Sequence, residues 1–340
     1  MLNNKKIFLS LLGVIIGITL GSILVALTGN GLLTLSQGLV KATIGSTYYM
    51  GEWLMNASIL ILTGLSVAFA YRAGIFNIGA EGQFIVGSMV ATIIGIIPGI
   101  PWGIHALLAV LLGTLAGALY GMIPGILKAY YRVNEVVVTI MLNWIALYYT
   151  NYLIANVFNG KSTIKTKPLQ ESASLGSDFL ANLFDGAKMH YGFIFVILAL
   201  VAYWFILEKT TYGFELKAVG FNRTAAKYSG INEKKAIIST LMISGAFAGL
   251  AGAIYALGAV DALSTVAVFR NYGFDGITIA FLGQFSAVGM SFAALLIAGL
   301  RSAGNIMLGV PKEIIDIVIS IILLCSILIP VLGKKRKGSK

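Results

Sequence analysis

Hydrophobic residues form long runs along the whole chain, and short polar breaks separate them. An α-helix needs about 20 apolar residues to cross the hydrocarbon core of a bilayer, and runs of that order recur throughout the sequence. The pattern predicts an all-α, polytopic membrane protein in which residues 1–340 form one transmembrane domain. Ten spans fit the pattern best, at 7–27, 55–71, 82–97, 104–123, 136–155, 191–207, 236–258, 275–288, 291–309 and 313–332.

Composition supports a lipid environment. Hydrophobic residues make up 58% of the chain and charged residues 11%, against roughly 45–50% and about 25% in a soluble domain. The net charge of +11 raises the question of nucleic-acid binding. On the ten-span model, however, 16 of the 24 Lys and Arg residues fall in the loops on the side of the two termini, and seven fall in the opposite loops. The positive-inside rule therefore predicts cytoplasmic termini, and we expect no nucleic-acid partner.

The polar stretch "YRAGIFNIGAEGQF", residues 71–84, interrupts the apolar pattern. The apolar runs on either side, 57–70 and 84–97, each reach only about 21 Å as a helix, short of a roughly 30 Å core. The stretch therefore either dips into the membrane as an unwound segment or forms a cytoplasmic turn. In the second case, Arg72 ends one helix and Glu81 interacts with the N-terminal dipole of the next.

An unwound segment would offer hydrogen bonds to a polar solute from Asn77, Glu81 and Gln83. Asn143 and Gln284 are the polar groups best placed inside the predicted spans. These five residues form the predicted substrate pathway.

Few ionisable residues fall inside the predicted spans, whereas ion-coupled carriers commonly bury them there. The exceptions are Arg301 and Asp316, so a largely neutral path suits an uncharged solute. Trp144, Tyr148 and Tyr149 suit either stacking on a base or anchoring at the membrane interface.

The loop 208–236 is the longest one on the predicted cytoplasmic side. Asn222 suits a helix N-cap, Gly230 suits a left-handed C-terminal position, and Asn232 suits the cap of the next span. An apolar stripe along this loop needs a cover, either the lipid interface or a groove on a partner protein. The stripe consists of Phe214, Ala218, Phe221, Ala225 and Tyr228.

Glycines at four-residue spacing predict close approach of helix backbones. They occur at 13, 17 and 21, at 113, 117 and 121, and at 245 and 249. The spacing fits either a dimer face or packing within the bundle. The segments "GQFIVGSMVA" from Gly82 and "GQFSAVGMSFA" from Gly283 are faintly similar, which fits either chance or an internal repeat of the kind found in transporters. The external loop 156–190 suits either a docking site or a connector.

Three motifs, "AGIFNIGAEGQ", "LKAVGFNRTAAKYSGI" and "GFDGITIAFLG", resemble the permease subunits of bacterial ABC importers. The similarity is to the branch related to ribose and branched-chain amino-acid permeases, and within it to members that take up nucleosides delivered by a basic-membrane-protein lipoprotein. The resemblance implies a segment that couples to the ATPase. It also suggests Asp275 as the N-cap of a helix. The coupling segment would contain Gly220, Asn222, Ala225, Ala226 and Gly230.

The resemblance implies a non-catalytic permease in the bacterial cell membrane that translocates nucleosides by alternating access. Its expected partners are a cytoplasmic ATPase subunit, a second related permease chain and a substrate-binding lipoprotein. No cofactor, metal or catalytic residue is expected in this chain, because ATP and Mg²⁺ would bind to the ATPase. The alternatives are an ABC permease for simple sugars such as ribose or a galactofuranose-like sugar, and an ion-coupled secondary carrier.

Overall fold

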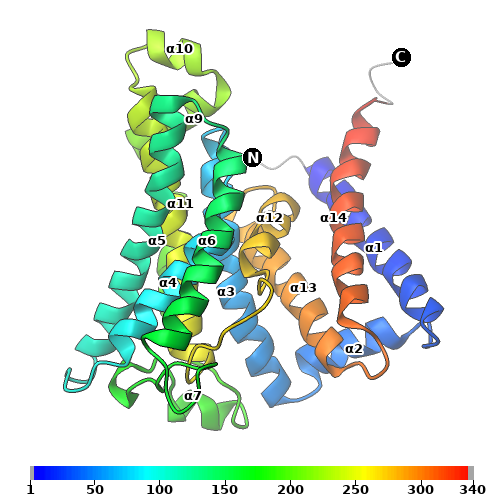
Figure 1. Ribbon diagram of the computed structural model, residues 1–340. Helices are drawn as coiled ribbons and strands as arrows, with labels where there is room; N and C mark the ends of the chain where they lie inside the picture. Colours follow the sequence, from blue (N-terminus) through cyan, green and yellow to red (C-terminus); the bar gives the residue numbers. More distant parts are fainter. Residues whose placement is uncertain (1–3, 336–340) are drawn as a thin grey trace.

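The computed structural model describes residues 4–335, and this part of the chain is helical, with three isolated β-bridges and no strand (Figure 1). Arg336, Lys337 and Lys340, part of the basic tail assigned to the cytoplasm, lie outside it. The elements are α1 (Asn4–Leu27), α2 (Thr34–Ile44), α3 (Thr47–Arg72), α4 (Ala80–Gly95), α5 (Ile104–Tyr131), α6 (Glu135–Asn156), η1 (Glu171–Ala173), α7 (Asp178–Leu183), α8 (Gly192–Lys209), α9 (Thr211–Phe221), α10 (Arg223–Tyr228), α11 (Glu233–Ile254), η2 (Tyr255–Ala259), α12 (Tyr272–Leu282), α13 (Ala287–Ile306) and α14 (Lys312–Lys335).

Six helices of the described chain are long and apolar enough to cross a membrane: α3, α5, α6, α8, α11 with its extension η2, and α13. The helices α4 and α12 are apolar but shorter. The prediction of an all-α, multi-pass membrane protein with some short helices is therefore confirmed, and the total of ten crossings stays a prediction. In Figure 1, α9 and α10 lie at one end of the molecule, together with the start of α1 and the end of α14. The short helix α7 lies at the opposite end.

The predicted helix 275–288 is wrong at its C-terminal end. The helix α12 stops at Leu282, because Gln284 and Phe285 have φ angles of 52° and 57°. L-residues rarely adopt this left-handed conformation, and it cannot continue a right-handed helix. The side chain of Ser286 then accepts a hydrogen bond from the Gly289 amide and caps α13.

The helix α3 is also longer than its apolar run suggested. It has 26 residues, about 39 Å at 1.5 Å per residue, so it can cross a bilayer alone. The helix α4 has 16 residues, about 24 Å, and is short, as its apolar run indicated. The difference arises because α3 begins among polar residues at Thr47, where Ser46 caps it.

Glycines bring the helices into close contact within this chain. Those of α5 pack against Gly245 and Gly249 of α11, and those of α1 pack against α14. The spacing therefore serves packing inside the bundle, the second of the two interpretations drawn from the sequence.

Candidate functional site

The polar segment 73–79 lies inside the helix bundle. The side-chain amide of Asn77 donates to the Ser244 hydroxyl at 2.8 Å, and this hydroxyl in turn donates to the backbone carbonyl of Ser66 at 2.7 Å. Ser66 lies six residues before the end of α3, and Ser244 lies eleven residues after the start of α11. At 1.5 Å per residue, Asn77 is therefore about 9–16 Å below those helix ends. The structure therefore has the segment that dips inward. It also has the two helix ends of the other interpretation, because α3 ends at Arg72 and Glu81 lies in the first turn of α4.

The polar side chains around this segment are engaged with one another and with the backbone. The side-chain amide of Asn77 also donates to Gln83 Oε1 at 2.9 Å, and Asn77 Oδ1 accepts from the backbone amide of Gly79 at 2.9 Å. Asn143 accepts from the Gly82 amide at 2.8 Å and donates to the Ile78 carbonyl at 3.1 Å. The start of the segment bonds to the last turn of α3, and the side-chain bonds satisfy the Ile78 carbonyl, the Gly79 amide and the Gly82 amide in the first turn of α4. Satisfied backbone groups are the condition for such a segment at membrane depth.

Glu81 joins two helices at their N-termini. It is in the first turn of α4, and its carboxylate accepts from the backbone amides of Asn271, at 3.1 Å, and Gly273, at 2.6 Å, at the start of α12. A carboxylate at a helix N-terminus satisfies unpaired amides and interacts favourably with the helix dipole. Glu81 thus holds the two short helices together in the middle of the bundle.

Four of the five residues predicted for the substrate pathway are closed off from solvent in this structure. Asn77, Glu81, Gln83 and Asn143 are buried, with at most 1% of each residue exposed. Gln284 lies in the turn between α12 and α13, and not within a helix as the sequence suggested. None of the five lines the polar cavity described next. The geometry supports a structural role for the four buried residues.

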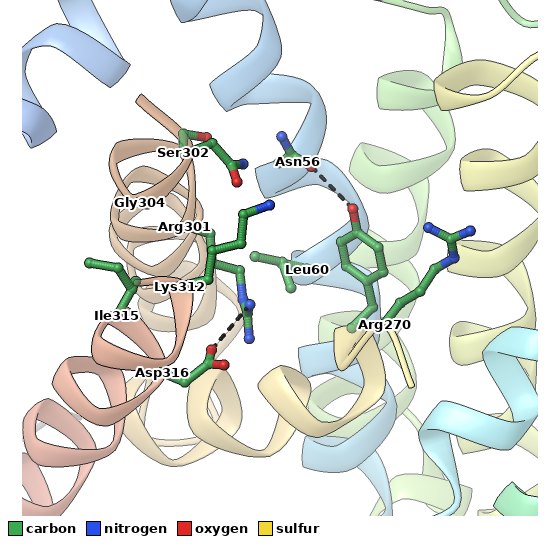
Figure 2. A pocket seen from close by; sticks show the side chains of 11 residues that line it. Asn56, Leu60, Arg270, Arg301, Ser302, Gly304, Lys312, Ile315 and Asp316 are labelled. Carbon is green, nitrogen blue, oxygen red and sulfur yellow. Dashed lines mark hydrogen bonds and ion pairs between the residues drawn. The ribbon is translucent and has the colours of Figure 1, made fainter. Parts of the chain in front are cut away.

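A polar cavity of about 380 Å³ opens between α3, the start of α12, α13 and the start of α14 (Figure 2). Its volume is within the roughly 300–1,000 Å³ typical of small-molecule sites. Figure 2 shows Arg301 of α13 beside Asp316 of α14, with Asn56 of α3 and Arg270 on the other side. The lining residues are Asn56, Leu60, Arg270, Tyr272, Arg301, Ser302, Gly304, Asn305, Lys312, Ile315 and Asp316.

Asp275 is not the N-cap of α12, contrary to the prediction from the sequence. The N-cap position is Asn271, and Asp275 lies one turn into the helix, where both its carboxylate oxygens pair with the Arg301 guanidinium. Arg301 also lies 3.4 Å from Asp316. Sequence reasoning noted Arg301 and Asp316 as unusual inside spans but missed Asp275 as the partner, because 26 residues separate the two members of the pair.

The predicted cap and left-handed positions in the loop 208–236 are confirmed. The Asn222 side chain accepts from the Ala225 amide at 3.0 Å and caps α10, and the Asn232 side chain accepts from the Lys235 amide at 3.1 Å and caps α11. Gly230 has a φ of 87°, with open space around it. A β-carbon on Gly220 would lie 2.5 Å from the Arg72 carbonyl oxygen, so α9 touches the segment that follows α3.

The predicted apolar stripe does not form a single face. Phe214, Phe221 and Tyr228 are exposed, the last two at 94% and 89%. The buried side of α9 and α10 consists instead of Leu216, Val219 and Ala226. The reason is the break at Asn222, whose extended backbone changes the direction of the helix between the two halves of the stripe. Exposed aromatic side chains therefore gather at this end of the molecule.

A family model of the branched-chain amino acid transport system permease component matches residues 49–327. Because the match covers most of the chain, the protein belongs to this family of transport permeases.

Individual relatives match over most of their length. The guanosine ABC transporter permease NupP of Bacillus subtilis is 45% identical over 94% of this chain and 92% of the relative. The nucleoside ABC transporter permease NupB of Lactococcus lactis is 35% identical over 95% and 91%. The glucose ABC transporter permease TsgB13 of Haloferax volcanii is 30% identical over 83% and 77%. No solved structure matches the chain.

Proposed function

We propose that the chain is the transmembrane permease subunit of an ABC importer and translocates nucleosides by alternating access. The observation that carries the proposal is the 45% identity to a guanosine permease over 94% of the chain. The short, paired helices α4 and α12 support it, since interrupted helices that meet at mid-depth are a feature of transporter cores.

The proposed topology has ten crossings and two cytoplasmic termini in a bacterial cell membrane. Its support is the basic bias of the loops and the common location of α9, α10, the start of α1 and the end of α14 in Figure 1. The external end then carries α7 and the loop around it.

The proposed drive is ATP hydrolysis in a separate cytoplasmic subunit that docks on α9 and α10. The exposed side chains of Phe214, Phe221 and Tyr228 support this assignment, because apolar groups that gather in one exposed region mark protein or membrane interaction sites. Gly220, Asn222, Ala225, Ala226 and Gly230 form the proposed coupling segment. The contact of Gly220 with the Arg72 carbonyl offers a direct route from that segment to the transmembrane helices.

The complete transporter would also contain a second related permease chain and a substrate-binding lipoprotein. Two permeases related by a two-fold axis follow the usual symmetry of such assemblies. This chain itself would carry no enzymatic activity and no cofactor of its own.

Uptake of radiolabelled guanosine, uridine and ribose tests the proposal in cells that express the chain with its ATPase, companion permease and lipoprotein. We expect accumulation of the nucleosides that stops when the ATPase subunit carries a hydrolysis-blocking substitution. Accumulation that persists with the inactive ATPase and collapses with the ion gradient would support a secondary carrier instead.

A sugar permease is the second candidate, and the similarity to the glucose permease favours it. The same assay separates the two, because a sugar permease would accumulate ribose or glucose and leave guanosine outside the cell.

A further inference from the structure

The segment 260–271 crosses half of the bundle without helical structure. It follows η2, and Figure 1 shows it rising beside α6 to the start of α12. Asn151 of α6 holds Val266 through two hydrogen bonds of 2.8 and 3.1 Å, and the Trp144 ring packs on Phe269 with centroids 4.5 Å apart. Asn151 and Trp144 lie five and twelve residues before the end of α6, so the segment climbs to a depth of about 18 Å along that helix.

The upper part of this segment leaves its backbone without partners. Among the described residues, no hydrogen bond involves the backbone amides or carbonyls of 267–270. Val268 is 71% exposed, and Ala267 and Arg270 are exposed as well. The lower part differs, because Leu263, Thr265 and Val266 all have partners in the chain.

Lipid cannot cover this part of the molecule. Each backbone group without a partner in hydrocarbon costs several kcal/mol, so irregular backbone at membrane depth occurs only against protein or water. Arg270, an exposed residue, adds a second reason. Its guanidinium donates one hydrogen bond to the Ser264 hydroxyl at 3.2 Å and lies over the Tyr255 ring, and a charged side chain near the bilayer centre faces a bundle interior or an aqueous cavity. Arg270 lies about as deep as the middle of α6, which is itself one of the six candidate spans.

Aromatic side chains surround the unpaired backbone. The Trp144 ring stacks on Tyr148 with centroids 5.6 Å apart and planes 22° apart. Phe269 packs against Trp144 with planes tilted by 59°, and Trp144 stays 40% exposed. Tyr148 and Tyr152 continue this exposed face along α6 toward the end of the molecule that carries α7. The face thus combines ring surfaces with free amides and carbonyls.

We infer that the face formed by Trp144, Tyr148 and residues 267–270 lines a water-filled translocation path and binds a solute that carries both an aromatic ring and hydroxyl groups. The rings stack on the base, and the free backbone groups together with Arg270 hydrogen-bond to its polar edge and sugar. A nucleoside has both parts, so the inference rests on the proposed function for its substrate class. The second permease chain completes the opposite wall of the path.

Thiol accessibility tests the aqueous path independently of any substrate. In the assembled transporter, with Cys325 replaced by serine, Val268→Cys is compared with Val201→Cys, a matched valine at mid-length of α8 that is 55% exposed. A charged, water-soluble methanethiosulfonate reagent needs the thiolate, which forms in water and not in lipid. We expect Val268→Cys to react at least ten-fold faster, and guanosine to slow the reaction. The two variants are compared in the nucleotide-free and in the ATP-bound transporter. If Val268→Cys and Val201→Cys react at equal rates in both states, lipid or packed protein covers the segment, and the inference of a water-filled path is wrong.

Substitution of Trp144 tests the stacking role. Loss of one base–aromatic contact lowers affinity about ten-fold, so we expect Trp144→Leu to reduce guanosine uptake by that factor and Trp144→Phe to retain most of it. Full uptake by the leucine variant, or rapid Val268→Cys labelling that guanosine leaves unchanged, would overturn the binding site. If the proposed function itself is wrong, the result differs. The wild-type transporter would then take up no nucleoside, while Val268→Cys would still react rapidly because the path is water-filled.

Discussion

Replacing Gly117 with alanine tests how closely α5 and α11 are packed. The new β-carbon would lie 2.5 Å from both the Gly245 carbonyl oxygen and the Gly249 α-carbon, where ordinary contact needs 3.4–4 Å. Both neighbours are backbone atoms, so no side chain can rotate away, and the helices must separate by about 1 Å. A gap of that size forfeits a quarter to a half of the dispersion energy of the contacts along the seam.

Overpacking of this kind costs about 1–3 kcal/mol. The expected result is an apparent Tm of the purified protein in lipid nanodiscs that is roughly 2–10 °C below that of the wild type. Gly249→Ala forces the same separation, because its β-carbon would meet the Gly117 backbone at 2.8 Å. The double variant should therefore lose less stability than the sum of the two single variants, as expected for residues in contact.

Gly31→Ala is the matched control, since its β-carbon would meet only the Thr34 hydroxyl at an ordinary 3.5 Å. We expect it to change the Tm by no more than about 1–2 °C. A Gly117→Ala protein as stable as this control, or strict additivity with Gly249→Ala, would refute the argument that the two backbones are in contact.

Three further predictions concern other parts of the molecule. Asp275→Ala should destabilise the protein by about 3 kcal/mol, because it leaves the partly buried Arg301 with only Asp316 as an acidic partner. Thermal unfolding measures this loss, and an unchanged Tm would contradict the prediction. Burial lowers the pKa of His190 to about 4, so the unfolded chain binds a proton below about pH 6.5 that the folded chain does not, and stability should fall between about pH 6.5 and pH 4. Thermal unfolding across this range should show a flatter profile for His190→Gln, and parallel profiles would exclude His190 as the cause. Gly230→Val should abolish uptake while membrane insertion persists, because valine resists the φ of 87°. The control Gly186→Val, at a φ of 85° in the external loop, should retain uptake. Equal losses of uptake in the two variants would contradict a special role of Gly230 in coupling.

Local signals in the sequence predicted a large part of this structure. Asn222, Asn232 and Gly230 occupy the cap and left-handed positions that their side chains and backbone preferences favour. The sequence did not predict the break at Gln284, because local signals there are weak. Only Gly283 and Ser286 indicate a turn in that apolar stretch. The resemblance of three motifs to ABC permeases is confirmed at the level of the family by the match over residues 49–327.

The sequence by itself determined the solvent, the helical class and the family, because hydropathy, caps and motifs depend on residues that are close together in the chain. Only the tertiary structure decided what each polar group contacts. Asp275 binds Arg301, and Glu81 binds the start of α12 from 190 residues away. The unpaired backbone of 267–270 likewise becomes visible only when its depth along α6 is known. The reason is physical: in a medium without water, a polar group is stable only beside a partner, and packing between distant segments selects that partner.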